Sequence, residues 1–155
     1  MGAARLLMPL FALVAVTVAA QQPAGAASAP ARDFVVIVNS ANPAASIERD
    51  DLSKMFFKRL VKWPHGTAVE PIDLSPSERA RLVFTQSVHG KSVGAVRAFW
   101  QQQIFSGRSV PPSEKRNDAE VMQYVREHPG AVGYVSSELE LQPGVKTLEI
   151  KGLKR

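Results

Sequence analysis

The chain has 155 residues, a formal net charge of +5 and no cysteine. The lack of cysteine excludes a disulfide framework and a lipid-anchored thiol. Lysine and arginine are scattered, with no aromatic residues between them that could stack on bases, which argues against a nucleic-acid-binding protein. The positive balance favours anionic small molecules or acidic surfaces as partners.

Residues 1–27 are typical of a secretory signal peptide, because Arg5 precedes an apolar run from Leu6 to Ala20 and small residues follow. Cleavage is expected after Ala20 or after Ala27. The apolar run has about 15 residues, short of the roughly 20 that span a bilayer, which disfavours the alternative of a membrane anchor. We therefore expect a periplasmic or secreted protein with one compact domain over residues 28–155 and no transmembrane segment after cleavage.

The first part of the expected domain begins with a strand and a helix. Residues 33–39 form a continuous run rich in Val and Ile, which predicts a strand buried on both faces. Residues 49–58 carry apolar side chains at helical spacing, with acidic residues in the first turn. A turn over residues 63–66 then leads to a second strand over residues 69–74.

The remaining expected elements are three helices and two strands, over residues 77–88, 92–105, 117–127, 131–135 and 145–150. The first of these helices would bury an inner stripe of Ala80, Val83, Phe84 and Val88, and the second would bury Val96, Phe99, Trp100 and Ile104. The pair Pro111–Pro112 predicts an extended link between them and the third helix. Strands that alternate with helices predict an α/β fold.

The turn over residues 73–81 is the best candidate for a ligand site, because it joins the end of a strand to the start of a helix. Unpaired amides at a helix start favour anions, and ligands gather at the carboxyl ends of strands in α/β sheets. Ser75 and Ser77 could donate hydroxyls, and Arg79 and Arg81 could donate guanidinium N–H groups. The alternative interpretation makes Ser77 a helix cap and both arginines part of a solvated helix face.

Ser40, which follows the first strand, is a further candidate for the same cleft. Its neighbours Asn39 and Asn42 could also face the ligand, although Asn, Ser and Pro residues in this pattern commonly form a plain turn. No catalytic residue, cofactor or metal site is expected. The three histidines are widely spaced, and no Gly-x-Ser-x-Gly turn is present, so an enzyme is not predicted.

The order of strand, turn, helix and Trp turn, with Val38-Asn39, Phe56 and Trp63 at its key positions, resembles the phosphate-binding protein of bacterial phosphate ABC transporters. The resemblance continues through residues 105–108 and 130–135. It implies a single lobe of the periplasmic-binding-protein type, in which a mixed, mostly parallel sheet is flanked by helices. Trp63 and Trp100 could flank a ligand, but core packing is the expectation.

That family binds its anion with an Arg-x-Asp-Gly-Ser-Gly-Thr loop, near which this chain places Ser75, Ser77 and Arg79. The loop here has no glycine, and Pro76 removes one amide donor. The resemblance implies an exported solute-binding protein for phosphate or a similar oxyanion, associated with ABC-type transport or sensing. The alternative is an interaction module that keeps the fold and recognises a membrane permease or a sensor. A relic of a longer binding protein is the third interpretation.

Overall fold

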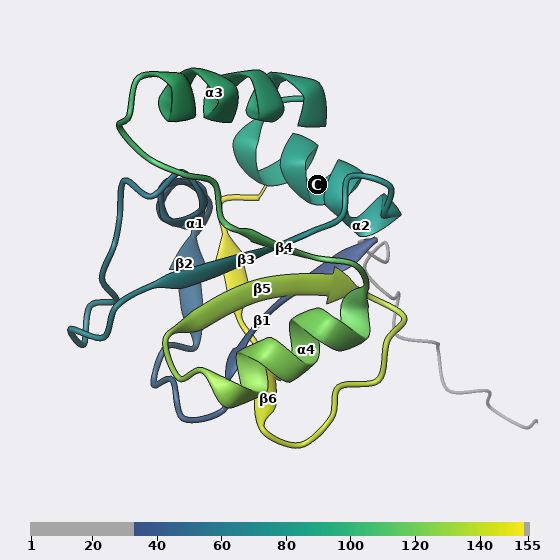
Figure 1. Ribbon diagram of the computed structural model, residues 1–155. Helices are drawn as coiled ribbons and strands as arrows, with labels where there is room; N and C mark the ends of the chain where they lie inside the picture. Colours follow the sequence, from purple (N-terminus) through teal and green to yellow (C-terminus); the bar gives the residue numbers. More distant parts are fainter. Residues whose placement is uncertain (1–32, 154–155) are drawn as a thin grey trace, which may run out of the picture.

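The computed structural model describes residues 33–153, and the predicted signal peptide over residues 1–27 lies outside them (Figure 1). The helices are α1 (Arg49–Phe56), α2 (Arg79–Phe84), the π-helix η1 (Thr85–His89), α3 (Val93–Phe105) and α4 (Asp118–Glu127). The strands are β1 (Phe34–Asn39), β2 (Ser46–Glu48), β3 (Glu70–Leu74), β4 (Ser113–Lys115), β5 (Ala131–Ser136), β6 (Val145–Thr147) and β7 (Glu149–Lys151). No helix within the described residues is long and apolar enough to cross a membrane.

The strands form a five-stranded sheet in the order β4-β3-β5-β1-β6 and a two-stranded sheet of β2 and β7. In the larger sheet β3 runs parallel to β4 and β5, whereas β1 runs antiparallel to β5 and β6. The pair of β2 and β7 is parallel, so three of the five strand pairs are parallel. The predicted α/β fold with a mixed, mostly parallel sheet is confirmed.

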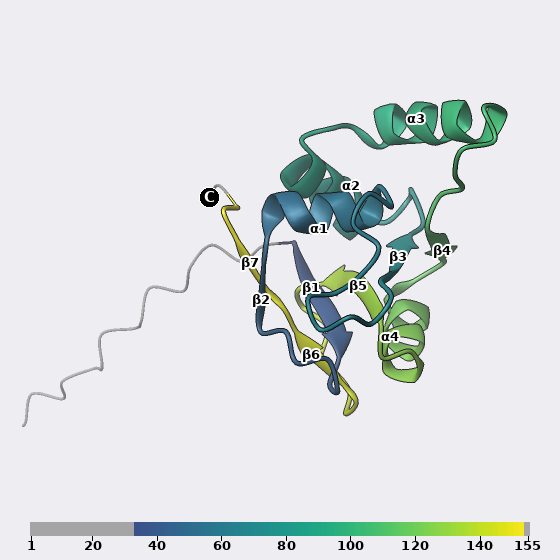
Figure 2. The ribbon, with the colours of Figure 1, turned by 90° about the vertical axis from the view of Figure 1, so that its left-hand side faces the viewer.

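Helices cover both faces of this sheet, which explains the uninterrupted apolar sequences of β1 and β5. On one face Gly133 of β5 approaches α4 so closely that an added Cβ would lie 2.7 Å from Cγ1 of Val121. On the other face the next residue, Tyr134, stacks on Phe84 of α2 with a ring separation of 3.8 Å. Figure 2 shows α1 and α2 on one side of the sheet and α4 on the other.

Two short strands were not predicted. The three-residue strands β2 and β4 are too short to show a periodicity, and β4 lies directly after the predicted Pro111–Pro112 link. The single strand expected over residues 145–150 is divided at Leu148 into β6 and β7, which belong to different sheets.

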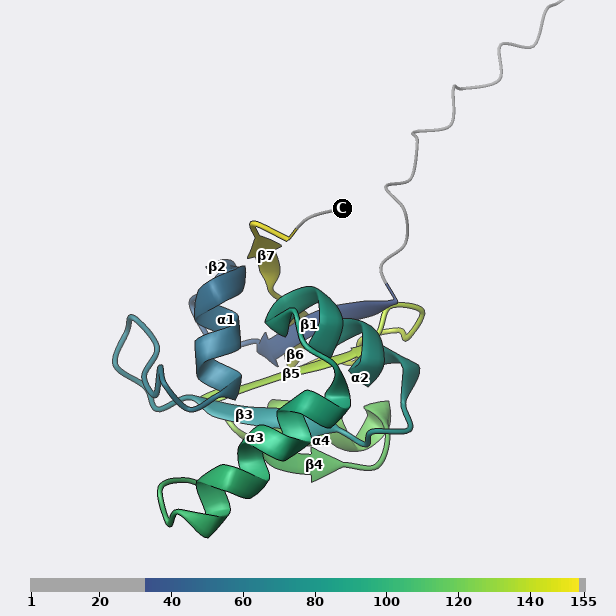
Figure 3. The same ribbon diagram turned by 90° about the horizontal axis from the view of Figure 1, so that it is seen from above.

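Helix α3 lies higher than α1 and α2 in Figure 1, and Figure 3, seen from above, shows it over β3 and β4. Its N-terminus is capped by Ser92, whose hydroxyl accepts from the Ala95 amide at 3.2 Å. The buried residues of α3 are Val96 and Trp100. The prediction that Ile104 would be buried is wrong, because Ile104 is 51% exposed at the outer end of the helix. Helix α3 therefore packs on the rest of the protein through a narrow strip of side chains.

Candidate functional site

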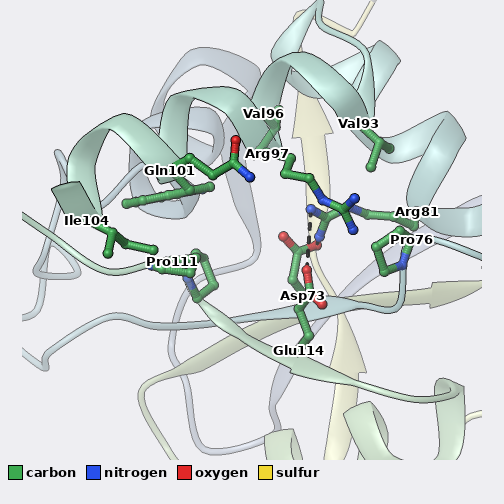
Figure 4. A pocket seen from close by; sticks show the side chains of 12 residues that line it. Asp73, Pro76, Arg81, Val93, Val96, Arg97, Gln101, Ile104, Pro111 and Glu114 are labelled. Atoms are coloured by element: carbon green, nitrogen blue, oxygen red, sulfur yellow. Dashed lines mark ion pairs between the residues drawn. The ribbon is translucent and has the colours of Figure 1, made fainter.

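A pocket of about 160 Å³ lies between α3, the carboxyl end of β3 and the segment from Pro111 to Glu114 that leads into β4 (Figure 4). Seven of its twelve lining residues are apolar, four are charged and one is a glutamine. The charged residues are Asp73 of β3, Glu114 of β4, Arg81 of α2 and Arg97 of α3. The carboxyl end of β3, the kind of place where ligands bind in α/β sheets, thus forms one side of the pocket.

The charged floor of the pocket is set by strand register. Asp73 and Glu114 are register partners in the parallel pair β3 and β4, which places their carboxylates on the same face. Arg81 forms an ion pair with Asp73, and its Nη2 lies 4.0 Å from Oε1 of Glu114. The side chains of Arg81 and Asp73 are only 5% and 8% exposed, so this pair is shielded from solvent screening.

Tyr134 completes this buried network from β5. Its hydroxyl donates to Asp73, accepts from the Leu74 amide at 3.3 Å and lies 3.4 Å from Nη1 of Arg81. Burial raises the pKa of Tyr134 above its usual range, and the Arg81 charge opposes this effect. The hydroxyl therefore stays protonated and can donate to Asp73 at neutral pH.

Arg81 is consequently not on a solvated helix face, and its charge is already neutralised. Its Nη1 also donates to the Leu74 carbonyl at 3.4 Å. The buried Nε has no hydrogen-bond partner among the described residues, which leaves one N–H group of the pocket floor without an acceptor. Arg81 is therefore part of the buried network and contributes little net positive charge to the pocket.

Arg97 provides the available positive charge. It lines the pocket from α3, its side chain is exposed, and it forms no ion pair or hydrogen bond with another residue in the range 33–153. Figure 4 shows its guanidinium near that of Arg81 and above the carboxylates of Asp73 and Glu114. The sequence-based prediction did not identify Arg97, although it is the single charged residue in the thirteen residues of α3.

The predicted residues of the 73–81 turn lie at the edge of this pocket. Ser75 and Ser77 flank the lining residue Pro76, and their hydroxyl oxygens are 3.0 Å apart. The predicted Ser77 cap is wrong, because α2 begins at Arg79 after Glu78 as N-cap, with no side-chain capping bond. Arg79 is exposed and pairs with Asp33 at 3.2 Å. A ligand would have to compete with this ion pair and with the bond between the serines.

Ser40 lies at the opposite end of the sheet along the strand direction, far from the carboxyl end of β3. Val38 of β1 is the register partner of Val132 in β5, and Val132 is the partner of Pro71 at the start of β3. The residue after β1 is therefore near the amino end of β3, whereas Ser75 follows its carboxyl end. The expectation that Ser40 shares a cleft with the 73–81 turn is wrong, because β1 runs antiparallel to β5.

The residues around Ser40 form a turn, as the alternative interpretation predicted. Nδ2 of Asn39 donates to the Val125 and Arg126 carbonyls at 3.0 and 2.8 Å. Oδ1 of Asn42 accepts from the Ala44 amide at 2.9 Å. These asparagines thus hold the backbone of the turn and the end of α4.

His89, at the end of η1, is the most strongly perturbed base in the described part of the chain. Its Nδ1 lies 2.9 Å from the Ser53 hydroxyl of α1, and aromatic rings surround it. Burial, together with the charges of Arg81 and Lys91, lowers the pKa of His89 to about 4. The Ser53–His89 pair joins α1 to η1.

Within residues 33–153, no group of three or more His, Asp or Glu side chains is placed to hold a metal ion.

Solved structures with a similar fold come from phosphate-binding proteins. An ABC-type phosphate transport receptor from Vibrio cholerae matches with a TM-score of 0.59 and 16% identity, over 79% of this chain and 47% of the other. A putative phosphate ABC transporter substrate-binding protein with bound phosphate, from Clostridium perfringens, matches with a TM-score of 0.60 and 14% identity, over 79% and 46%. PstS from Borrelia burgdorferi matches with a TM-score of 0.58 and 11% identity, over 79% and 49%.

The chain thus spans about half the length of the proteins whose fold it shares. No curated protein sequence matches it. The model of a family described as the PBP superfamily domain matches residues 14–152. On this evidence the chain belongs to the PBP (periplasmic binding protein) superfamily.

Proposed function

We propose that this chain is an exported solute-binding protein whose pocket binds a small oxyanion of the phosphate class. The observation that carries the proposal is the Arg97 guanidinium, which lines a pocket at the carboxyl end of β3 and forms no ion pair among the described residues. A guanidinium donates two parallel N–H groups to an oxyanion. The phosphate-binding proteins that share the fold support the same class of ligand.

The ligand would lie at the mouth of the pocket, between Arg97 and the 73–81 turn. There Arg97 supplies the charge, and Ser75 and Ser77 supply hydroxyls. The four charges of the pocket sum to zero, and the turn has no glycine to bring amides onto the anion. We therefore expect weak binding, helped at long range by the formal net charge of +5.

Export and transport form the second part of the proposal. Residues 1–27 would direct the chain to the periplasm, where the lobe would pass its ligand to an ABC permease or a sensor. The intact mass of protein purified from the periplasm tests export, because cleavage after Ala20 or after Ala27 leaves products of different mass. Uncleaved protein in the cytoplasm would contradict this part.

Ligand binding is tested with a thermal-melt screen of the purified protein against phosphate, sulfate and small carboxylates at fixed ionic strength. A ligand at about 100 times its dissociation constant adds roughly 2.7 kcal/mol, a shift of several degrees for a domain of this size. We expect a selective shift that Arg97→Ala abolishes and that Arg126→Ala preserves. Arg126 is an exposed arginine on α4 at the other edge of the sheet.

Arg79→Ala tests the alternative in which the anion binds at the start of α2 and not at Arg97. If Arg79→Ala removes the shift and Arg97→Ala does not, the anion binds at the helix start beside Asp33, and the assignment to Arg97 is wrong. If no oxyanion shifts the melting temperature of the wild-type protein at millimolar concentration, the solute-binding function itself is wrong.

An interaction module is the second candidate, because three large apolar side chains are exposed at the end of α3 and in the segment after it. Phe105 is 91% exposed, and Ile104 and Val110 are more than half exposed. Such side chains are typical of a docking surface for another protein. Co-sedimentation with membranes that contain the permease or sensor would decrease for Phe105→Asp, and unchanged co-sedimentation would contradict this candidate.

A further inference from the structure

We infer that the ligand of this pocket is an organic oxyanion, in which a phosphonate, phosphate or carboxylate group is attached to an apolar body about the size of an aromatic ring. The inference rests on the proposed oxyanion function and names its substrate class. Its evidence is the chemistry of the part of the pocket that inorganic phosphate would leave empty.

The size of the pocket exceeds what a bare oxyanion needs. An engineered cavity of about 150 Å³ lined by Leu, Ile and Phe side chains binds benzene. The present pocket has about 160 Å³, and seven of its twelve lining residues are apolar. A ring-sized apolar group therefore fits the available volume and the character of the walls.

The charged side chains of the pocket gather at one end, beside Val93 and Pro76, and the other end is apolar. Figure 4 shows Ile104 and Pro111 at one end, and Arg97, Arg81 and the two carboxylates at the other. Trp100 also lines the pocket. A ligand with its charged group at Arg97 would direct its body toward Ile104 and Pro111. Burial of that body removes apolar surface from water, which inorganic phosphate cannot do.

The equal numbers of positive and negative side chains in the pocket also favour an organic oxyanion over a bare one. Asp73 and Glu114 offset the charges of Arg81 and Arg97, so attraction between an anion and this pocket is limited. A bare anion would depend on Arg97 for nearly all of its affinity. An organic oxyanion adds apolar contact energy that is independent of the charge balance.

Phenylphosphonate is a suitable probe, with inorganic phosphate and benzyl alcohol as comparisons. The chain has two tryptophans, so its proton–nitrogen NMR spectrum contains two indole N–H resonances. The Trp100→Phe variant shows which of the two belongs to Trp100. Trp63 is buried outside the pocket and bonded to the Gly130 carbonyl, which makes its resonance an internal control. We expect phenylphosphonate to shift the Trp100 resonance, leave that of Trp63 in place, and bind about tenfold more tightly than phosphate. Tenfold corresponds to about 1.4 kcal/mol.

Two variants separate the apolar part from the charged part. Ile104→Ser should weaken phenylphosphonate several-fold and leave phosphate unchanged, whereas Arg97→Ala should weaken both. Val110→Ser is the matched control, because Val110 is also an exposed branched residue but does not line the pocket. Ile104 is half exposed, so its replacement should leave the fold intact.

Three outcomes overturn the inference. If phosphate binds as tightly as phenylphosphonate, the organic body contributes nothing, and the proposed oxyanion function still stands. If benzyl alcohol binds as tightly as phenylphosphonate, the pocket recognises a neutral ring, and the negative charge of the ligand contributes nothing to binding. If neither phosphate nor phenylphosphonate binds, both the inference and the proposed function are wrong.

Discussion

Replacing Asp73 with leucine would leave the Arg81 guanidinium buried without its counter-charge. The two side chains are 8% and 5% exposed, so water cannot take over the lost contacts without local unfolding. Removal of one partner of a buried ion pair costs about 3–5 kcal/mol, whereas replacement of both partners by apolar residues is often close to neutral. We therefore expect Asp73→Leu and Arg81→Met each to lower the free energy of unfolding by about 3–5 kcal/mol.

The double variant should be much more stable than the sum of the single effects indicates. Combined, Asp73→Leu and Arg81→Met leave no buried unpaired charge, because Glu114, the other partner of Arg81, is half exposed. The Tyr134 hydroxyl loses an acceptor, which costs about 1–3 kcal/mol. Urea unfolding at pH 7, followed by circular dichroism, gives the free energies for a double-mutant cycle. We expect a coupling energy of about 2 kcal/mol or more.

The exposed pair Arg116–Glu120 supplies the matched control, since its side chains are 88% and 29% exposed. Its removal should leave the free energy of unfolding nearly unchanged, because solvent screens an exposed ion pair. Single effects at Asp73 and Arg81 that add to within about 0.5 kcal/mol in the double variant would refute the coupling. The network would then be a surface-like ion pair, and the view of the pocket floor as a neutralised, fixed structure would be wrong.

Two further predictions concern stability. The pKa of His89 is lowered from 6.5 to about 4 in the folded state. Between pH 6.5 and pH 4 the His89 side chain therefore binds a proton more readily in the unfolded chain than in the folded one. Stability should therefore fall as the pH drops from 6.5 toward 4, by up to about 3 kcal/mol relative to His89→Phe; parallel urea titrations of both proteins check this, and identical pH profiles would contradict it. Gly130→Ala places a Cβ 2.2 Å from the Ala68 carbonyl oxygen and should cost about 1–3 kcal/mol, whereas Gly94→Ala on α3, with its nearest atom at 3.9 Å, should be neutral or stabilising. Equal melting temperatures for the two glycine variants would show that the Gly130 backbone can move.

The elements of this fold were predictable where the local sequence is strongly patterned. The apolar run of β1 and the helical spacing in α4 each specify one element whatever its surroundings. The expected helix over residues 92–105 corresponds to α3, which spans Val93–Phe105. The direction of a strand is not specified by its local sequence, because it depends on the path that the long connections between strands take. No local pattern distinguishes a β1 that runs with β5 from one that runs against it.

The same distinction explains the outcome for the candidate site. Ser75, Ser77 and Arg79 follow β3, and their place beside the carboxyl end of β3 needed only local information. The burial of Arg81 depends on Asp73, Glu114 and Tyr134, which come from three separate strands. Arg97 reaches the pocket only because α3 folds over β3 and β4. A single charge in an otherwise uncharged helix was the one signal in the sequence that could have identified it.

The sparse attachment of α3 has a consequence for how a ligand would be detected. A helix held by two buried side chains, Val96 and Trp100, should open locally at a much lower free energy than the central strands. One wall of the pocket would then fluctuate while the sheet remains folded. A ligand that bridges this wall and the strand ends would slow amide hydrogen exchange in α3 even at concentrations too low to change global unfolding. Ligand binding would thus be detected first as slower amide hydrogen exchange in α3, before any change in global stability.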